Sequence, residues 1–262
     1  MNEELGIMNN LNLLRKIIFF WKKPKIIIIT GNGQEATAGI LFCLLSQNFK
    51  VAKFKEKAPD ILSICKKEIL IFESDLKKIR TAKDFKFLVK KSQLPILVIT
   101  QFGDIPPAAL SDEPKGRASP NEVGRAAPSG EPQPQKGQDK DFFAGDKKDT
   151  IQSRELAKIL PAYGYLILNF DDETVREIGE ETDLKGITFG FQEGADLRAS
   201  DIRLNSGTNF KINYKGNIVP IWLEKAFGKE LIYSALGAAA VGTVLGFNLV
   251  EISSSLKNYN SP

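Results

Sequence analysis

The chain contains no histidine among its 262 residues. Histidine acid–base catalysis, Ser-His-Asp and Cys-His nucleophiles and every histidine-ligated metal site are therefore excluded. Cysteine is almost as scarce: Cys43 and Cys65 both stand in apolar surroundings, which indicates reduced core residues of a cytoplasmic protein. With 42% apolar and 26% charged residues, the composition is that of an ordinary globular protein and excludes collagen-like and disulfide-scaffold classes.

A strong charge of one sign and a convincing membrane span are also missing. The net charge of +4 is too small to predict a nucleic-acid partner, which usually needs a clustered basic face. Residues 12–21 hold only five consecutive apolar residues, too few to span a bilayer. Residues 231–250 are long enough and carry no charge, but their glycines and polar residues favour a buried helix. We therefore expect no membrane span.

One stretch lacks the residues that build a core. Residues 111–140 contain five prolines and no aromatic residue, so they bury too little surface to offset the entropy of ordering. We predict a disordered Pro/Gly-rich insertion over 104–150, which a folded domain tolerates because loop closure depends weakly on length. The predicted organisation is then an N-terminal helical extension (1–22), a central domain in two parts (23–103 and 151–262) and this insertion.

What is present is an alternation of strand and helix signals. Lys25–Thr30 is a β-branched run of the kind that is buried on both faces of a parallel sheet. The pattern predicts an α/β fold, with a mostly parallel sheet flanked by helices and a small antiparallel β subregion near 200–223. The other expected strands are 50–54, 68–72, 95–100, 164–169, 186–190, 201–204, 209–214 and 217–223; the expected helices are 34–48, 84–91, 153–160, 173–180, 229–246 and 249–258.

The turn Gly31-Asn32-Gly33, between a strand and a helix, is the strongest local signal. Such a turn offers backbone N–H groups and a helix N-terminus to a phosphate. It lacks the Lys-Ser/Thr of a strict P-loop, because Gln34 and Glu35 stand there. It also fits a dinucleotide-binding fingerprint, with Glu56 as the ribose-binding acid, and it fits a tight turn without a ligand. The residues alone leave these three interpretations open.

Five pieces of the chain carry a family resemblance through their order and spacing. They are KPKIIIITGNGQEATAGILFCLL, PILVITQFGDIP, LAKILPAYGYLILNFDDETVREI, GITFGFQEGADLRASDI and the helical segment VPIWLEKAFGKELIYSALGAAAVGTVLGFNLVEISSSLKNY. Together they resemble the central ATP-binding domain of the Mur ligases, most closely the D-alanyl-D-alanine-adding ligase. The resemblance covers about 20–104 and 150–260, and it implies a P-loop-type domain.

The resemblance implies binding of ATP and Mg²⁺, and ATP-dependent amide-bond formation in cytoplasmic peptidoglycan precursor synthesis. It places Glu73 at a magnesium-binding position. It assigns nucleotide binding to Thr30, Gly31, Asn32, Gly33, Gln34, Glu35, Asn169, Asp171 and Asp172.

The same resemblance shows where this chain departs from the family. The phosphate-loop Lys is Gln34, and the magnesium-binding Thr that follows it is Glu35. The carbamylated Lys falls near Ser153, and the His of the family's G-x-H is Lys229, with its Asn near Ser234. We expect this chain to lack the family's N-terminal and C-terminal domains. We therefore expect weak or absent nucleotide binding.

Three functional hypotheses follow. The first is a ligase that needs a partner chain to supply the C-terminal domain; the second is a non-catalytic pseudoenzyme that binds a complete Mur ligase as a scaffold. The third is a dinucleotide-binding Rossmann-type domain that depends on Glu56.

Overall fold

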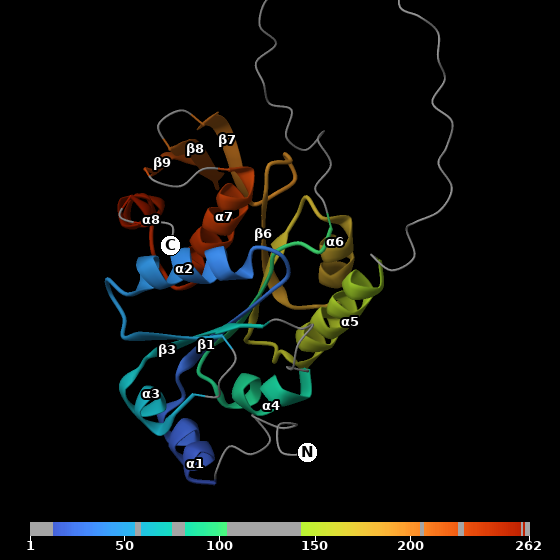
Figure 1. Ribbon diagram of the computed structural model, residues 1–262, viewed down its shortest axis with the longest axis vertical. Coiled ribbons are helices and arrows are strands. Elements are labelled where there is room, and N and C mark those ends of the chain that lie inside the picture. Colours follow the sequence, from blue (N-terminus) through green and yellow to red (C-terminus); the bar gives the residue numbers. More distant parts are fainter. Residues whose placement is uncertain are drawn as a thin grey trace, which may run out of the picture.

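The computed structural model describes residues 13–55, 59–74, 82–103, 143–204, 207–224, 228–257 and 259 (Figure 1). The strands are β1 (Lys25–Thr30), β2 (Val51–Phe54), β3 (Ile69–Glu73), β4 (Pro95–Ile99), β5 (Tyr165–Asn169), β6 (Lys185–Gly190), β7 (Leu197–Leu204), β8 (Thr208–Tyr214) and β9 (Asn217–Leu223). The helices are α1 (Leu13–Lys22), α2 (Gln34–Leu45), α3 (Ile61–Lys66), α4 (Ala82–Lys91), α5 (Phe143–Ile159), α6 (Glu173–Glu180), α7 (Lys229–Val244) and α8 (Leu249–Leu256).

These strands form one sheet in the order β2-β3-β1-β4-β5-β6-β7-β8-β9. Pairing is parallel from β2 to β7 and antiparallel from β7 to β9. The predicted α/β class and mostly parallel sheet are confirmed. The antiparallel part is continuous with the parallel sheet, and its β8–β9 hairpin turns at Lys215 and Gly216, both with positive φ as a tight hairpin turn requires.

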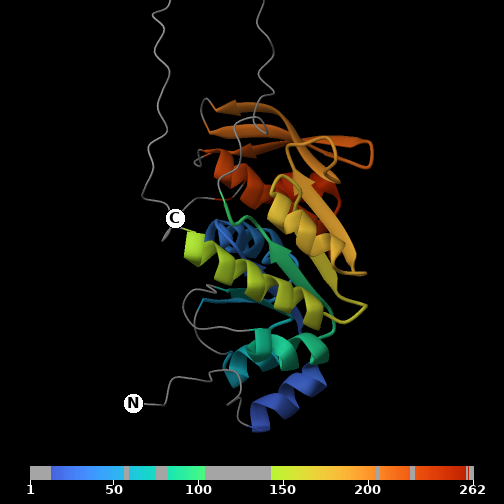
Figure 2. The ribbon, with the colours of Figure 1, turned by 90° about the vertical axis from the view of Figure 1, so that its right-hand side faces the viewer.

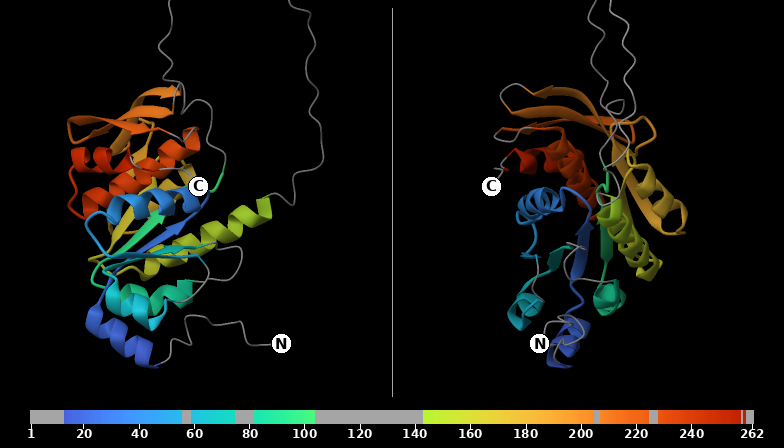
Figure 3. Two further views of the ribbon diagram at one scale, coloured as in Figure 1. Left: turned by 60° about the vertical axis from the view of Figure 1, so that its left-hand side comes forward. Right: turned by 45° about the vertical axis from the view of Figure 1, so that its right-hand side comes forward.

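Helices cover both faces of the parallel sheet (Figures 2 and 3). Successive side chains of a strand point to opposite faces, so Ile27 and Ile29 of β1 pack with the α2, α7 and α8 side, while Ile26 and Ile28 pack with the α1, α4, α5 and α6 side. Both cores consist almost entirely of fully buried aliphatic and phenyl side chains. This two-sided burial explains why β1 is a run of four isoleucines.

Helix α7 accounts for most of the long uncharged segment 231–250. It is buried from Leu231 to Gly242 and packs against α2 and the sheet. A Cβ at Gly237 would meet the Phe189 ring at 3.4 Å, so the small residues allow the helix to approach closely. Across the described part of the chain, no helix is long and apolar enough to span a membrane.

The structure differs from the sequence-based prediction at three elements. Helix α5 begins at Phe143, ten residues before the predicted Ser153, so 143–150 are helical and do not belong to the insertion. Helix α3 was not predicted; it is short, and Asp60 caps it by accepting a hydrogen bond from Ser63 N. Strand β7 begins at Leu197, four residues early. Residues 1–12 of the predicted extension and 104–142 of the predicted insertion lie outside the described residues.

Candidate nucleotide site

The loop between β1 and α2 is built from glycines in conformations that other residues rarely adopt. Gly31 has φ +96° and Gly33, the residue that precedes α2, has φ +78°. A Cβ at Gly31 would lie 2.6 Å from Thr100 Oγ1 and 2.7 Å from the Gln101 carbonyl oxygen, so only glycine fits. The helix N-terminus therefore follows a loop whose shape depends on the two predicted glycines.

The loop is held in place from β4. The Thr100 hydroxyl lies 2.6 Å from the Asn32 carbonyl and 3.0 Å from the Thr30 carbonyl, and it can donate to either one. Asn32 N donates to the Gln101 carbonyl at 2.7 Å. The backbone path of the loop is thus fixed by neighbouring elements before any ligand binds, which is the arrangement expected of a preformed phosphate loop.

Several side chains at the carboxyl ends of the strands point to the same face of the sheet, the face that α2 covers. Ile71, Val51 and Ile167 belong to the α2-side core, so Glu73, Lys53 and Asn169, two residues further along β3, β2 and β5, lie on that face. Ile29 of β1 pairs with Glu73, which puts the carboxylate beside the glycine loop. From β3 to β5 the edge spans three strand spacings, roughly 14 Å.

Glu73 is the most unusual residue of this edge. It is 1% exposed, yet neither carboxylate oxygen accepts a hydrogen bond from the described residues. Lys53 Nζ lies 3.2 Å from Glu73 Oε1 and supplies the opposite charge. A buried carboxylate whose lone pairs are unfilled is suited to binding a hard cation or a ligand donor.

Gln34 and Glu35 occupy the first turn of α2. Gln34 Oε1 is buried and accepts no hydrogen bond from the described residues. Glu35 is exposed, and Lys55 Nζ lies 3.0 Å from its Oε2. The hydrogen bond from Lys55, and then its charge, lower the pKa of Glu35. Lys53 of β2 and Lys55, which directly follows β2, therefore bring two positive charges to the place where the phosphate-loop lysine is missing.

Asn169 and Asp171 follow β5. Asn169 Oδ1 accepts a hydrogen bond from Asp171 N, while its buried Nδ2 donates to none of the described residues. Asp171 is fully engaged: its carboxylate accepts hydrogen bonds from Phe191 N, Gln192 N and the Tyr233 hydroxyl. Asn169 thus keeps a free donor for a ligand, whereas Asp171 joins the β5 end to β6 and α7.

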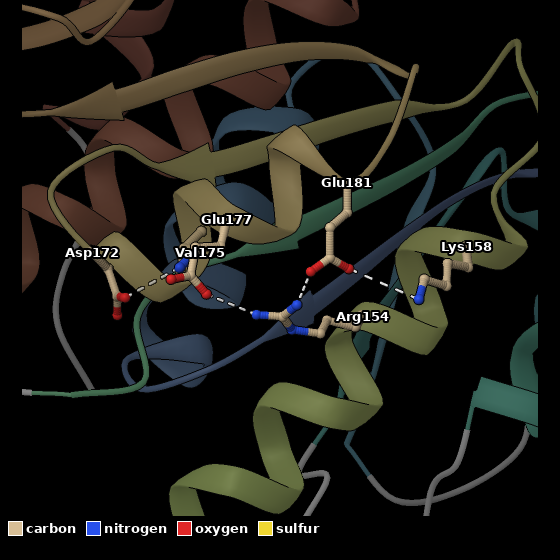
Figure 4. A network of polar contacts seen from close by, with 6 residues as sticks. All are labelled: Arg154, Lys158, Asp172, Val175, Glu177 and Glu181. Atoms are coloured by element: carbon tan, nitrogen blue, oxygen red, sulfur yellow. Dashed lines mark hydrogen bonds and ion pairs between the residues drawn. The ribbon is translucent and has the colours of Figure 1, made fainter.

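Asp172 is likewise used by the fold. Its Oδ1 accepts from Val175 N and caps α6 (Figure 4), while its Oδ2 accepts from Phe102 N at 2.8 Å. In the same view, Arg154 of α5 forms ion pairs with Glu177 of α6 and with Glu181, the residue that follows α6 (Figure 4). These contacts hold α6 against α5 and against the end of β4. The carboxylate of Asp172 therefore has a structural role that requires no ligand.

Thr30 lies on the other face of the sheet. Its hydroxyl is 3.3 Å from that of Ser153 on α5, and both residues are fully buried. Ser234 of α7 approaches the loop from the α2 side, with its hydroxyl 3.5 Å from the Gly33 carbonyl. Of the predicted set, the structure therefore brings Gly31–Glu35 and Glu73 together, sets Asn169 further along the edge, and separates Thr30 from them.

Lys53 and Lys55 are not among the site residues predicted from the sequence. The available signal was the alternation of β2, because Lys53 and Lys55, the residue directly after the strand, are two positions apart. Glu56, the acid that a dinucleotide site requires, lies outside the described residues.

Comparisons with known proteins test the family resemblance. Residues 145–242 match the model of the Mur ligase middle domain. The UDP-N-acetylmuramate–L-alanine ligase of Persephonella marina is 33% identical over 111 residues, 41% of this chain and 23% of that protein. The corresponding ligase of Sulfurihydrogenibium sp. is 38% identical over 109 residues, 40% of this chain and 22% of that protein.

Solved structures extend the likeness to nearly the whole chain. The D-alanyl-D-alanyl ligase of Acinetobacter baumannii matches 95% of this chain and 49% of its own, with a TM-score of 0.67 and 16% identity. The MurF ligase of Thermotoga maritima, solved with ADP, matches 94% of this chain and 52% of its own, with a TM-score of 0.63 and 18% identity.

This chain is similar to the Mur ligases. The sequence match falls on 145–242, and the fold match covers both parts of the predicted central domain. The chain spans about half of the solved ligases and aligns with less than a quarter of the curated ones. The curated relatives add L-alanine whereas two matched structures are D-alanyl-D-alanyl or MurF ligases, so the finer resemblance to the D-alanyl-D-alanine-adding enzyme stays a prediction.

Proposed function

We propose that the carboxyl edge of this Mur-ligase-like domain binds the phosphates of ATP together with Mg²⁺, in a ligase of peptidoglycan precursor synthesis. The observation that carries the proposal is Glu73, a buried carboxylate with unfilled oxygens, set one strand away from a glycine loop that leads into α2. The loop supplies backbone N–H groups, and the N-terminus of α2 supplies partial positive charge. Both features bind phosphate without a particular side chain.

The missing lysine at position 34 has replacements nearby in space. Lys53 faces Glu73, and Lys55 faces Glu35, so each acid at this edge has its own cation. In the proposal, the positive charge of Lys55 offsets the negative charge of Glu35 near the bound phosphates. The net charge at this edge of the sheet is then close to zero, and we expect ATP to bind more weakly than at a site with a lysine in the loop.

The donor set fits Mg²⁺ when phosphates complete it. Among the described residues, no three His, Cys, Asp or Glu side chains gather in a way that could hold a metal. Mg²⁺, however, commonly binds through one or two carboxylates plus phosphates and water, and Glu73 is such a carboxylate. Bound there, the ion would neutralise phosphate charge. The protein's own part is to position the phosphates with the loop and to place Glu73 beside them, with Lys53 Nζ 3.2 Å from its Oε1.

Amide-bond formation also needs sites for an acid and an amine. We propose that these sites lie on a partner chain, so turnover appears only in that complex. The substitutions Gln34 and Glu35 favour a second candidate, a non-catalytic scaffold for a complete Mur ligase. The two differ in whether the partner elicits ATP hydrolysis.

A fluorescent ATP analogue titrated with and without Mg²⁺ tests the binding step. We expect saturable binding that Glu73→Gln makes independent of Mg²⁺ and that Lys55→Met weakens several-fold. The matched control is Lys185→Met, an exposed lysine at the start of β6 on the opposite edge of the sheet. Equal affinities for all four proteins, or no binding to any of them, would contradict the proposal.

A further inference from the structure

A second site lies at the opposite, amino edge of the sheet. A cavity of about 870 Å³ opens there, between the starts of β1–β4 and the ends of α1 and α3. Six of its ten lining residues are lysines and one is acidic: Lys22, Lys23, Pro24, Lys25, Lys50, Cys65, Lys66, Lys67, Glu68 and Gln93. The lysines come from three separate stretches of the chain, so the sequence alone shows no cluster.

The positive charge of this cavity is not balanced by its surroundings. Glu68 supplies one negative charge, and its carboxylate accepts a hydrogen bond from Lys50 N at 2.9 Å. Within the described residues, none of the six lysines forms an ion pair; Lys23 and Lys25 instead lie over the rings of Phe20 and Phe49. The lining of this one cavity therefore carries an excess of positive charge, which attracts anions.

Helix α1 adjoins the cavity and has two apolar faces. Phe19 points inward and is fully buried. The second face is turned to solvent and is defined here as the α1 stripe. Its members are Leu13, Leu14, Ile17, Phe20 and Trp21, between 47% and 81% exposed. At 100° per residue they cover an arc of about 120°, so they form one continuous band rather than scattered side chains.

The α1 stripe and the lysine cavity are parts of one surface. Phe20 of the stripe has Lys23 Nζ at 5.6 Å and Lys91 Nζ at 5.5 Å from its ring centre, and Lys23 also lines the cavity. Helix α1 lies at the end of the molecule opposite β7–β9 (Figures 1 and 3).

We propose that this surface docks the domain on an anionic phospholipid bilayer. An exposed band of Trp, Phe, Leu and Ile flanked by lysines is the composition of helices that lie in the membrane interface. The stripe enters the boundary between headgroups and acyl chains, and the lysine cavity takes the lipid phosphates. An acidic soluble partner would satisfy the lysines but would leave the aliphatic band unexplained.

Docking at this edge leaves the candidate nucleotide site free. The lysine cavity lies at the amino ends of the strands, whereas Gly31–Glu35 and Glu73 lie at their carboxyl ends. Strands of five residues separate the two edges of the sheet by roughly 17 Å. Variants of one edge therefore do not touch the other, and this proposal does not depend on the proposed function.

Vesicle binding with a tryptophan reporter tests the proposal. The chain has two tryptophans, so Trp222→Phe leaves Trp21 as the sole reporter. Phosphatidylcholine vesicles containing about a third phosphatidylglycerol should pellet the protein and shift Trp21 emission to the blue, whereas pure phosphatidylcholine should do neither. Raising the salt should weaken binding, because exposed charges are screened.

Paired variants separate the two parts of the surface. Lys66→Glu with Lys67→Glu should lower vesicle partitioning at least about tenfold, and Leu14→Gln with Ile17→Gln should abolish the blue shift. The matched controls are Lys215→Glu with Lys257→Glu, and Val250→Gln. All three residues are exposed, and Lys215 lies in the β8–β9 turn, at least four strands beyond β4 in the sheet. Absence of binding to anionic vesicles at low salt would overturn the proposal. So would a blue shift on raising protein concentration without lipid, which would assign the stripe to a second copy of the chain.

Discussion

The Tyr233 hydroxyl donates a 2.7 Å hydrogen bond to Asp171 Oδ2, which ties the first turns of α7 to the end of β5. Asp171 is 5% exposed, and its two oxygens also accept from Phe191 N and Gln192 N. A carboxylate with three donors has little left to offer a nucleotide. Asp171 is thus a structural residue of this edge, although the sequence placed it among the nucleotide ligands.

Replacing Asp171 should therefore destabilise the fold rather than abolish binding. Asp171→Asn turns one acceptor into a donor that faces buried N–H groups, and we expect a loss of about 2–4 kcal/mol in unfolding free energy. Asp60→Asn is the matched control: Asp60 is exposed and caps α3 by accepting from Ser63 N with Oδ1. Asn caps a helix as well as Asp does, so this variant should cost less than about 1 kcal/mol. Urea unfolding measures both; equal effects would contradict the assignment.

The same contact predicts a stability change at alkaline pH. Burial, and then the neighbouring Asp171 charge, raise the pKa of Tyr233 well above its usual value. The folded state therefore holds this proton where the unfolded state, with a pKa of about 10, loses it. The contribution is fully present below pH ~10 and falls as pH rises beyond it. The unfolding free energy of wild type should drop more steeply above pH ~10 than that of Tyr233→Phe; parallel curves would refute the prediction.

Alanine should destabilise the protein to different extents at the two glycines of the loop. Gly33→Ala meets only ordinary contact, with Ser234 Oγ at 3.5 Å, so its effect is the strain of positive φ, about 1–2 kcal/mol. Gly31→Ala has that strain and also meets Thr100 Oγ1 and the Gln101 carbonyl at under 3 Å, so the loop must move. Thermal unfolding should show the larger loss for Gly31→Ala. The reverse order would mean that the loop has another shape.

Restoring the family's phosphate-loop residues should strengthen nucleotide binding. Gln34→Lys adds a cation at the N-terminus of α2, and Glu35→Thr removes an anion there. We expect the double variant to bind ATP at least about tenfold more tightly, since a charge-assisted contact replaces a repulsive one. The control Lys257→Thr changes an exposed residue beyond α8 and should have no effect. An unchanged dissociation constant would show that the loop does not contact phosphate.

Much of the fold could be predicted from local pattern. The run Lys25–Thr30 and the turn at Lys215-Gly216 appear where periodicity and turn chemistry place them. The six-residue helix α3 could not be predicted, because so short a segment has too few turns to show a period. The start of α5 was missed because Gly145 and the charges that follow hid the helical pattern.

The site was predictable where its chemistry is local to the backbone. Gly31 and Gly33 indicate a turn between strand and helix without any knowledge of residues elsewhere in the chain. Their positive φ angles confirm the predicted turn. The pairing of Lys53 with Glu73 joins residues from two strands, and the lysine cavity joins four stretches of chain. Such clusters depend on strand order, which the sequence does not display.

The central claim is that the carboxyl edge binds nucleotide phosphate, and calorimetric titration of the purified chain with Mg-ATP tests it most directly. We expect one weak, saturable binding site. Gln34→Lys with Glu35→Thr should increase its affinity for ATP, and withholding Mg²⁺ should abolish binding. NADH, titrated in parallel, should give no heat. If neither the wild type nor the restored variant binds ATP while both unfold cooperatively, the site is not a nucleotide site and the claim is wrong.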